Sequence, residues 1–505
     1  MSMPCALLWP RPPRAARRSM TRRGALAALT VCCGGLLAGC GPSGSASSGA
    51  DSSPPSVSAA HSPSARPAPA STTPGTAGGQ TGSEADWPAY HRDRARTGAV
   101  ADGPALDPPR RAWTTSLGAA VRGQPVVAGG RIIAATERNR VVALDPATGR
   151  VLWSRALGAP LTDVAQVVGC GNIDPLGITS TPVIDTVHGI VYVVAEIGSG
   201  GTVHHQLVGF DVRTGRQRSS TRVDPPLPAG ESSTTLLQRA GLAFSGGRVY
   251  VAYTGNFGDC GRYHGWVVGV DPTGARPQVS FEVAPDGEGG AIWQSGGAPA
   301  VDAAGNLYVS TGNANPDPPQ GGPDPKKYTE SVVRLSPDLR VLASFKDRVA
   351  GGDEDLSAGN PVLLPGGEVF AVGKTDVGYL LRSSDLHQIA RIPNVCGSDP
   401  DGGPAFDRAT GSLFVPCRGG GIQVIDVTHR RLGPLLQGAD SAPIVVGQRL
   451  WALDHSTAEL VGYAVKTGAV QARVGVGVST PIFTSPSVGA GLLLVATTDG
   501  VVAFH

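Results

Sequence analysis

The chain repeats one short β unit eight times between residues 87 and 505, and this repetition limits the fold more than any other feature. Each unit opens on an apolar strand, usually beside a proline, and a glycine-containing turn leads into a second β-rich strand. The openings are Gln124-Pro125-Val126, Thr181-Pro182-Val183, Gly241-Leu242-Ala243, Ala298-Pro299-Ala300, Asn360-Pro361-Val362, Gly403-Pro404-Ala405, Ala442-Pro443-Ile444 and Ser485-Pro486-Ser487. Fixed-order β units at intervals of roughly 40–50 residues indicate a propeller or a solenoid.

The last unit is incomplete, and this predicts how the ring closes. Residues 485–505 supply three strands, while a fourth is available at the other end in Ala112 to Leu117. Pairing the two ends leaves no open blade edge. We therefore predict an all-β, eight-bladed β-propeller of four-stranded blades over residues 87–505, with its last blade closed by an N-terminal strand. A solenoid is the alternative, but it does not explain the split unit. No helical periodicity is expected in this region.

The first 40 residues have the layout of an export signal. Six arginines precede an apolar run from Ala25 to Ala38, which is too short to span a bilayer because a spanning helix needs about 20 apolar residues. The ending Leu37-Ala38-Gly39-Cys40 resembles a bacterial lipobox. We predict that residues 1–39 are a signal peptide and that Cys40 is lipidated; an ordinary secretory signal is the alternative. The sequence distinguishes neither the secretory from the twin-arginine route nor the start codon among Met1, Met3 and Met20.

Residues 40–86 are predicted to be a disordered tether, because a stretch of almost only Ser, Pro, Ala, Gly and Thr cannot bury apolar surface. Removing residues 1–39 takes away six arginines and no acid, so the formal net charge changes from +2 to −4. No basic stripe of the kind that binds nucleic acid remains. The expected location is extracytoplasmic, with membrane attachment through Cys40.

The segment Leu144-Asp145-Pro146-Ala147-Thr148-Gly149-Arg150-Val151-Leu152-Trp153 resembles the tryptophan-docking repeat of quinoprotein-type propellers, also called pyrroloquinoline quinone (PQQ) repeats. Asp86 to Tyr90 and Ala95 to Gly98 resemble the opening of exported proteins with such repeats. The chain is similar to outer-membrane assembly propeller lipoproteins and, more distantly, to PQQ-dependent alcohol dehydrogenases. The resemblance covers residues 86–505 and implies eight four-stranded blades.

The dehydrogenase resemblance implies a set of candidate site residues. Asn313, at the end of Ser310-Thr311-Gly312-Asn313, is similar to a calcium-binding asparagine, and Asp355 lies where those enzymes carry a catalytic aspartate that could also touch the metal. Lys374 resembles their quinone-contacting lysine, and Trp293 falls near their stacking tryptophan. The alternatives are that Asn313 caps a turn, that Lys374 is a solvated lysine, and that Asp353 to Asp355 form the exposed face of a loop.

Several departures favour a different function. The dehydrogenases often have two adjacent cysteines in an early blade, but the adjacent pair here, Cys32-Cys33, lies in the predicted signal. Glu196 lies several residues away from the position of their calcium-binding glutamate. The sequence also has no Cys-x-x-Cys-His haem motif. We therefore predict a non-catalytic binding or assembly scaffold at the cell envelope, with no catalytic residue and no cofactor. Its partner would be an envelope protein, a peptide or a cell-wall ligand. A PQQ- and Ca²⁺-dependent dehydrogenase of alcohols or sugars is the alternative.

Long insertions and cysteines complete the predictions. Loops on a rigid scaffold often bind partners, so Gly255 to His264 and Ala314 to Tyr328 are expected at the partner surface. His264 is expected to be a structural residue, and His204-His205 are expected to point to opposite faces of a strand.

Four cysteines remain after Cys40, and three pairings are possible. Neighbouring units favour Cys170 with Cys260, and a shared unit favours Cys396 with Cys417; free thiols in one pair are the alternative.

Overall fold

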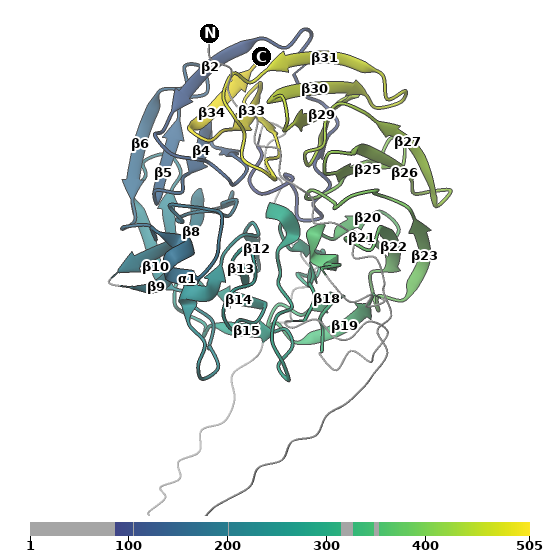
Figure 1. The fold of residues 1–505 in the computed structure, drawn as a ribbon. Helices are drawn as coiled ribbons and strands as arrows, with labels where there is room; N and C mark the ends of the chain where they lie inside the picture. The colour runs from purple at the N-terminus through teal and green to yellow at the C-terminus, as the bar shows by residue number, and fades with distance from the viewer. Residues whose placement is uncertain (1–85, 105, 200, 315–326, 348–352) are drawn as a thin grey trace, which may run out of the picture. The chain divides into compact units, whose positions relative to one another are not determined.

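Eight antiparallel sheets surround a common axis in the described part of the chain (Figure 1). The computed structural model describes residues 86–104, 106–199, 201–314, 327–347 and 353–505. These residues belong to one of the chain's two compact units, which spans residues 74–505. The signal peptide, Cys40 and almost all of the predicted tether lie outside the described residues, as does the greater part of the insertion from Ala314 to Tyr328.

The first four blades follow the order of the chain. Blade 1 contains β3 (Val126–Ala128), β4 (Arg131–Ala135), β5 (Arg140–Leu144) and β6 (Val151–Ala156). Blade 2 contains β7 (Val183–Asp185), β8 (Ile190–Ser199), β9 (Thr202–Asp211) and β10 (Gln217–Arg222). Blade 3 contains β12 (Ala243–Ser245), β13 (Arg248–Gly255), β14 (Trp266–Val270) and β15 (Val279–Glu282). Blade 4 contains β16 (Ala300–Val301), β17 (Leu307–Ser310), β18 (Ser331–Leu335) and β19 (Val341–Lys346).

The remaining blades complete the ring. Blade 5 contains β20 (Val362–Leu364), β21 (Glu368–Val372), β22 (Val377–Arg382) and β23 (Gln388–Pro393). Blade 6 contains β24 (Ala405–Asp407), β25 (Ser412–Cys417), β26 (Gly421–Asp426) and β27 (Arg431–Leu436). Blade 7 contains β28 (Ile444–Val446), β29 (Arg449–Asp454), β30 (Glu459–Ala464) and β31 (Val470–Gly475). Blade 8 contains β32 (Ser487–Gly489), β33 (Leu492–Ala496), β34 (Gly500–Phe504) and β2 (Arg111–Ser116).

The predicted closure of the ring is confirmed. Strand β2 pairs antiparallel with β34, with Thr114 opposite Val502, and Figure 1 shows the purple N-terminal strand beside the yellow C-terminal ones. Two strands were not predicted: β1 (Ala99–Val100) runs parallel to β28, and β11 (Leu236–Leu237) pairs with β13.

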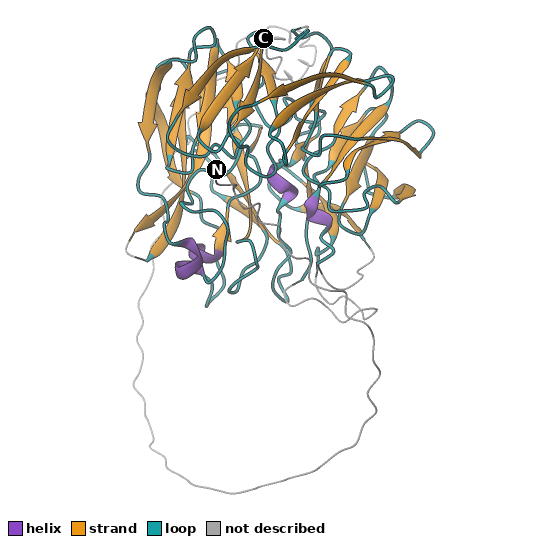
Figure 2. Ribbon diagram, turned by 45° about the horizontal axis from the view of Figure 1, so that its top comes forward, coloured by secondary structure: helices purple, strands orange, loops and turns teal. Residues whose placement is uncertain are grey.

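Helices are few in the described residues, and all are short (Figure 2). They are α1 (Val164–Val168) and the 3₁₀ turns η1 (Ser233–Thr235), η2 (Gln294–Gly296) and η3 (Leu356–Ala358). The expectation of no helix in this region therefore missed α1, which is too short to give a helical period. No described helix is long and apolar enough to cross a membrane.

Burial changes across each blade from the axis outward. The first strand of blade 1 is fully buried, whereas its fourth strand, β6, is largely exposed. Apolar side chains of neighbouring blades pack face to face; Ile133 and Ala143 of blade 1, for example, share a cluster with Val191 and Phe210 of blade 2. The core therefore lies between blades rather than on the axis.

Tryptophan docking joins some of these blades. The Trp153 ring lies on Gly215 in the next blade, where a Cβ atom would come within 2.6 Å of Trp153 Cδ2. The Trp153 indole N–H donates to the Val212 carbonyl oxygen at 2.9 Å. Trp113 makes the same contact with Gly149 and donates to the Pro146 carbonyl oxygen at 2.8 Å. Gly215 has a φ of +66°, which suits glycine because it has no Cβ.

Residues 86–100 form an N-terminal belt around the axis. Its backbone bonds to the innermost strands of six blades, with N···O distances of 2.7–3.0 Å. The partners are Val127 in blade 1, Ile184 in blade 2, Val301 in blade 4, Leu363 in blade 5, Phe406 in blade 6, and Val445 and Gly447 in blade 7. Side chains reach the other two blades, because Arg94 donates to Ser245 Oγ at 2.8 Å and His91 bonds Ser485 Oγ at 3.2 Å.

Candidate functional site

The strand order places two kinds of connection at each end of the ring. Loops from second to third strands share one end with the links between blades, and the turns from first to second strands lie at the other. A pocket of about 270 Å³ opens at the end that carries the links between blades. Loop residues Asn256 to Asp259 line it together with Trp293, Asp355 and Lys374. Three of the four candidate residues therefore face one pocket.

A lysine held by two aspartates dominates one side of the pocket. Lys374 Nζ donates to Asp353 Oδ1 and, at 3.1 Å, to Asp355 Oδ2. The other oxygen of Asp355 accepts the Asn313 backbone N–H at 2.9 Å. Burial would lower the pKa of Lys374, but the two carboxylates outweigh burial and raise it. Burial raises the pKa of Asp355 to about 6, although the Lys374 charge opposes this shift.

Asn313 reaches this cluster through its backbone and does not line the pocket itself. Lys374 is only 16% exposed and is paired, so it is not the solvated lysine of the alternative reading. Asp353 is 77% exposed at the rim, as a loop-face residue would be. The insertion from Gly255 to His264 lines the pocket as far as Asp259.

Two further side chains that line the pocket, Arg418 and Phe483, were not predicted from the sequence. The Trp293 and Phe483 rings meet edge to face, with centroids 6.0 Å apart. The Arg418 guanidinium lies 5.2 Å from the Phe483 centroid and is paired with Asp399 at 3.1 Å and Asp401 at 3.2 Å. Arg418 and Phe483 belong to no motif, and only the approach of separate blades brings them together.

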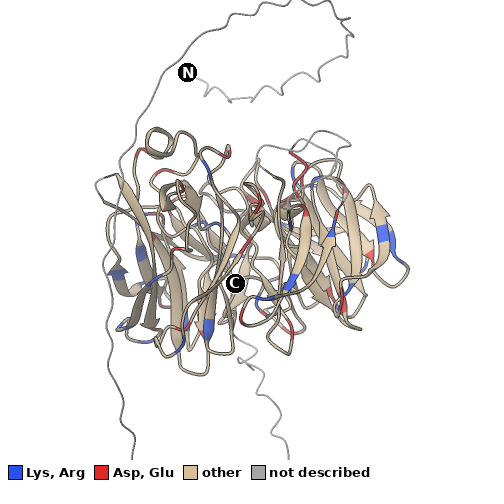
Figure 3. Cartoon of the chain, turned by 90° about the horizontal axis from the view of Figure 1, so that it is seen from below, with Lys and Arg blue, Asp and Glu red and all other residues tan. Residues whose placement is uncertain are grey.

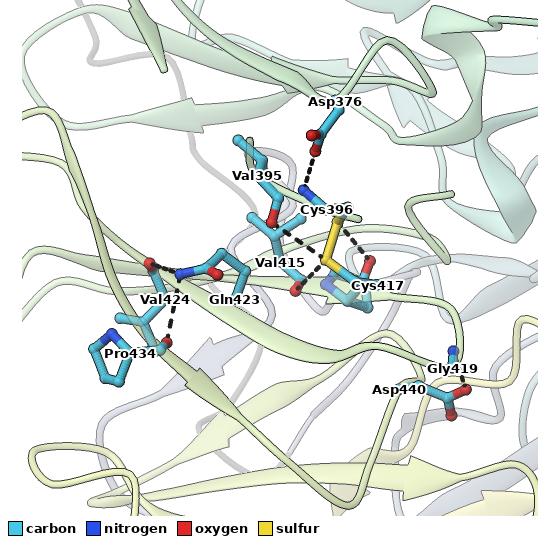
Figure 4. Close-up of a disulfide and its surroundings, with 11 residues drawn as sticks. Asp376, Val395, Cys396, Val415, Cys417, Gly419, Gln423, Val424, Pro434 and Asp440 are labelled. Atoms are coloured by element: carbon cyan, nitrogen blue, oxygen red, sulfur yellow. Dashed lines mark hydrogen bonds between the residues drawn. A yellow bond between two sulfur atoms is a disulfide. The ribbon is translucent and has the colours of Figure 1, made fainter. Parts of the chain in front are cut away.

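Two disulfides fix loops at this end, and their pairing is the predicted one. Cys170–Cys260 joins the link before blade 2 to the loop between β13 and β14, with a Cα–Cα distance of 5.8 Å. A Cβ atom on the pocket residue Gly258 would lie 3.2 Å from Cys170 Sγ, so this bond supports the pocket loop. Cys396–Cys417, with a Cα–Cα distance of 5.4 Å, joins the link before blade 6 to β25 (Figure 4).

A larger recess of about 1020 Å³ lies at the other end of the ring. The belt lines it together with the turns between the first and second strands of blades 4 to 7, and much of its surface is apolar. None of the sequence-predicted site residues lines this recess. Over the described residues, acidic and basic side chains are interspersed (Figure 3), so neither end carries a continuous charged stripe.

The fold and the site can now be compared with known proteins. Residues 104–322 match the sequence family described as outer membrane protein assembly factor BamB. The match covers less than half of the chain, and the chain folds as an eight-bladed β-propeller. No curated protein sequence matches the chain.

Solved structures resemble this propeller at low sequence identity. The quinohemoprotein alcohol dehydrogenase of Comamonas testosteroni has a TM-score of 0.65 and 16% identity, over 83% of this chain and 80% of that one. A quinohemoprotein alcohol dehydrogenase of Pseudomonas putida has a TM-score of 0.63 and 13% identity, over 83% and 80%. BamB from Moraxella catarrhalis has a TM-score of 0.52 and 14% identity, over 78% and 99%. These likenesses establish the fold alone.

In this pocket a lysine pairs with the carboxylate that the dehydrogenase resemblance assigns to calcium and to catalysis. Calcium binds six to eight oxygen atoms, but here the Lys374 ammonium occupies bonding positions of both Asp353 and Asp355. The lysine that would contact a quinone is held by the same two carboxylates. Within the described ranges, no group of three or more His, Cys, Asp or Glu side chains is arranged to hold a metal.

Glu196, the residue considered as a calcium ligand, belongs to a different buried cluster. His205 Nδ1 lies 2.9 Å from Asp224 Oδ1, and His205 Nε2 lies 3.6 Å from Glu196 Oε2. Burial raises the pKa of Glu196 to about 7. Burial opposes protonation of His205, but hydrogen bonds and charges from Asp224 and Glu196 raise its pKa to about 9. His264 is likewise held by Glu231, at 2.6 Å.

This cluster predicts a loss of stability at alkaline pH. Because the pKa of His205 rises from 6.5 when unfolded to about 9 when folded, the folded state binds the proton more tightly. The contribution is complete below pH 6.5 and is lost as the pH rises toward 9. The raised pKa of Glu196 acts in the same direction between pH 4.5 and 7. We expect the melting temperature to fall from pH 6.5 to 9.

Between pH 6.5 and 9, the His205→Gln variant should lose less folding stability than the wild type, by on the order of 2 kcal/mol. His188, whose side chain is 70% exposed, provides the matched control, and His188→Gln should keep the wild-type slope. Thermal melts from pH 6 to 9 measure the difference. Equal slopes for His205→Gln and the wild type would refute the assignment.

Proposed function

We propose that this chain is an exported, membrane-anchored propeller that binds an envelope ligand in the pocket lined by Trp293, Lys374 and Phe483 and does not catalyse a reaction. The ligand is an envelope protein, a peptide or a cell-wall fragment. The observation that carries the proposal is the pairing of Lys374 with Asp353 and Asp355. The pairing joins Asp355, the candidate base, and Lys374, the candidate quinone contact, in one ion-pair cluster. A preformed pocket lies beside this cluster.

Three further features support binding. The pocket lies among loops on a rigid ring, where binding residues commonly occur. Two side chains at its edge are apolar and accessible, since Phe257 is 50% exposed and Ile482 is 39% exposed. The matching family is described as an assembly factor of outer membrane proteins, which favours a protein or peptide as the ligand.

Photocrosslinking tests the location of the binding site. A benzoylphenylalanine residue placed at Phe257 should crosslink a specific envelope component in cells that produce the protein. Val187, which is 74% exposed in the turn between β7 and β8 at the opposite end of the ring, is the matched control. We expect the same crosslinked species at Phe257 and at Ile482 and none at Val187. Crosslinks of equal yield at all three positions would argue against a pocket-based function.

Membrane anchoring rests on the lipobox alone. Cys40→Ala should leave the propeller unprocessed or release it from the membrane fraction, because the lipid attachment site is lost. Fractionation followed by immunoblotting measures the change, and Cys5→Ala, which alters a cysteine within the predicted signal, serves as the control. Unchanged processing and membrane retention of Cys40→Ala would contradict the lipid anchor.

The dehydrogenase reading remains the second candidate because Trp293, Asp355 and Lys374 line one pocket. It is tested by adding PQQ and Ca²⁺ to purified protein. A bound quinone absorbance together with dye-linked oxidation of alcohols would favour this reading over the non-catalytic one.

A further inference from the structure

A buried arginine near the centre of the ring makes no ion pair with any described acidic residue, although the charges of Glu137 and Asp401 act on it. Arg239 lies between β11 and β12, is 1% exposed, and makes no ion pair within the described residues; its Nη2 atom also lacks a hydrogen-bond partner there. Nearby acids are already paired, because Glu137 lies 3.3 Å from Arg122, and Asp401 is bound to Arg418. A buried unpaired charge is costly, so its presence requires an explanation.

The backbone around Arg239 is shaped to accept it. A Cβ atom at Gly296 would lie 2.7 Å from Arg239 Nη1, so the guanidinium packs closely against η2 at a glycine. Gly296 has a φ of +82°, and its neighbour Ser295, which lines the pocket, has a φ of +44°. The guanidinium is therefore held against the segment that forms part of the pocket floor.

Phe483 lies against Arg239 and lines the pocket. Its ring centroid lies 5.2 Å from the Arg239 guanidinium carbon and 5.2 Å from that of Arg418. Phe483 has a φ of +67°, which is strained for a bulky side chain. Its neighbour Ile482 is 39% exposed. The Phe483 ring that lies against Arg239 therefore belongs to a short, strained turn at the surface.

The charges around the pocket indicate what this site would bind. Asp353 and Asp355 are bound to Lys374, Asp399 is bound to Arg418, and Asp259 accepts the Tyr263 hydroxyl at 2.6 Å. Arg239 is thus a cation without a carboxylate, next to a pocket whose acids already have partners. A guanidinium presents a planar set of donors that matches a carboxylate.

We propose that Arg239 is the anchor for the carboxylate of the pocket's ligand, which displaces the Phe483 ring and places an apolar or aromatic part beside Trp293. The ligand is therefore an organic acid or a peptide carboxylate. The proposal rests on the proposed function, since it assumes that this pocket is the binding site. It adds the ligand's chemical class and identifies Phe483 as the side chain that must move.

Small aromatic probes test the proposal in the full-length protein. Phe483→Ala removes a benzyl group and should create a space that accepts benzoate or benzyl alcohol, which differ in charge at similar size. We expect benzoate to bind at least about tenfold more tightly than benzyl alcohol, because a hydrogen-bonded charge pair strengthens binding by this factor or more. Calorimetric titration measures both affinities. The wild type should bind benzoate more weakly than Phe483→Ala does.

Matched double variants identify the arginine responsible. Phe483→Ala with Arg239→Gln should lose the preference for benzoate to within about twofold. Phe483→Ala with Arg418→Gln is the control, because Arg418 lies equally near the ring but is already paired, and the preference should persist. Phe483→Ala with Arg239→Lys should keep an intermediate preference, which tests the charge without burying a neutral amide.

Equal affinities of Phe483→Ala for both probes would overturn the proposal, as would a preference that survives Arg239→Gln or that depends on Arg418 instead. Crosslinking at Phe257 in that case would leave the binding function standing and refute only the carboxylate anchor. Absence of crosslinking together with an Arg239-dependent benzoate preference would locate the failure in the proposed function.

Discussion

Deleting residues 86–100 is expected to unfold the propeller at 37 °C. The belt bonds to the innermost strands of six blades through its backbone, and it buries Trp87 completely and Tyr90 almost completely. Truncating one buried aromatic side chain costs about 3–5 kcal/mol, whereas a whole domain is stable by only about 5–15 kcal/mol. Losing both aromatic residues and the backbone bonds should exceed this margin. Circular dichroism melts and limited proteolysis measure the outcome.

A deletion of equal length in the predicted tether, residues 60–74, provides the control. That deletion should leave the melting temperature unchanged, since a Ser-, Pro- and Ala-rich segment is not expected to contribute to a core. A belt-deleted protein that still melts cooperatively within a few degrees of the wild type would show that the belt is not needed for the fold.

Replacing Trp153 with alanine is expected to lower the free energy of unfolding by about 3–5 kcal/mol. The indole is 7% exposed and lies between blades 1 and 2, so its removal leaves a cavity and deprives the Val212 carbonyl of a donor. Trp153→Phe keeps most of the packing and should cost less. Chemical denaturation at neutral pH gives the difference for each variant.

Ser219 offers a matched control for this prediction, because it lies on the fourth strand of blade 2 where the tryptophan of the motif is absent. Ser219→Ala should change stability by less than about 0.5 kcal/mol, as is typical of surface positions. If Trp153→Ala proved no more destabilising than Ser219→Ala, docking would not be what joins the first two blades.

The repeat predicted the fold because every unit carries its own strand and turn signals. Opening strands such as Val126 to Ala128 are buried and continuously apolar, and this pattern recurs wherever a blade begins. Closure of the ring could be predicted because the last unit lacks a strand that residues 112–117 supply. The disulfides could be predicted because neighbouring blades bring Cys170 and Cys260 together and a single unit contains both Cys396 and Cys417; free thiols in either pair are excluded by the two bonds.

The belt and much of the pocket could not be predicted, for a physical reason. The belt acts mainly through backbone N–H and C=O groups, which every residue has, so its sequence carries no periodic signal. The pairing of Lys374 with Asp353 and Asp355 depends on how two loops approach each other. Arg239 and Phe483 become a pair only through the curvature of the ring, since 244 positions separate them in the sequence.

Closure by β2 also has a consequence for the order of events during synthesis. The belt and β2 are made first among the described strands, but β2 must wait for β34, which is the last of the described strands to be made. Contacts of such long sequence separation form slowly because the intervening chain must first be closed into a loop. Until then, β2 and the free edge of β33 are open to wrong pairing and to proteases. A premature stop before β34 would thus leave β2 without its partner strand, so a chain that ends before β34 should be cleared rather than persist as a shorter, working propeller.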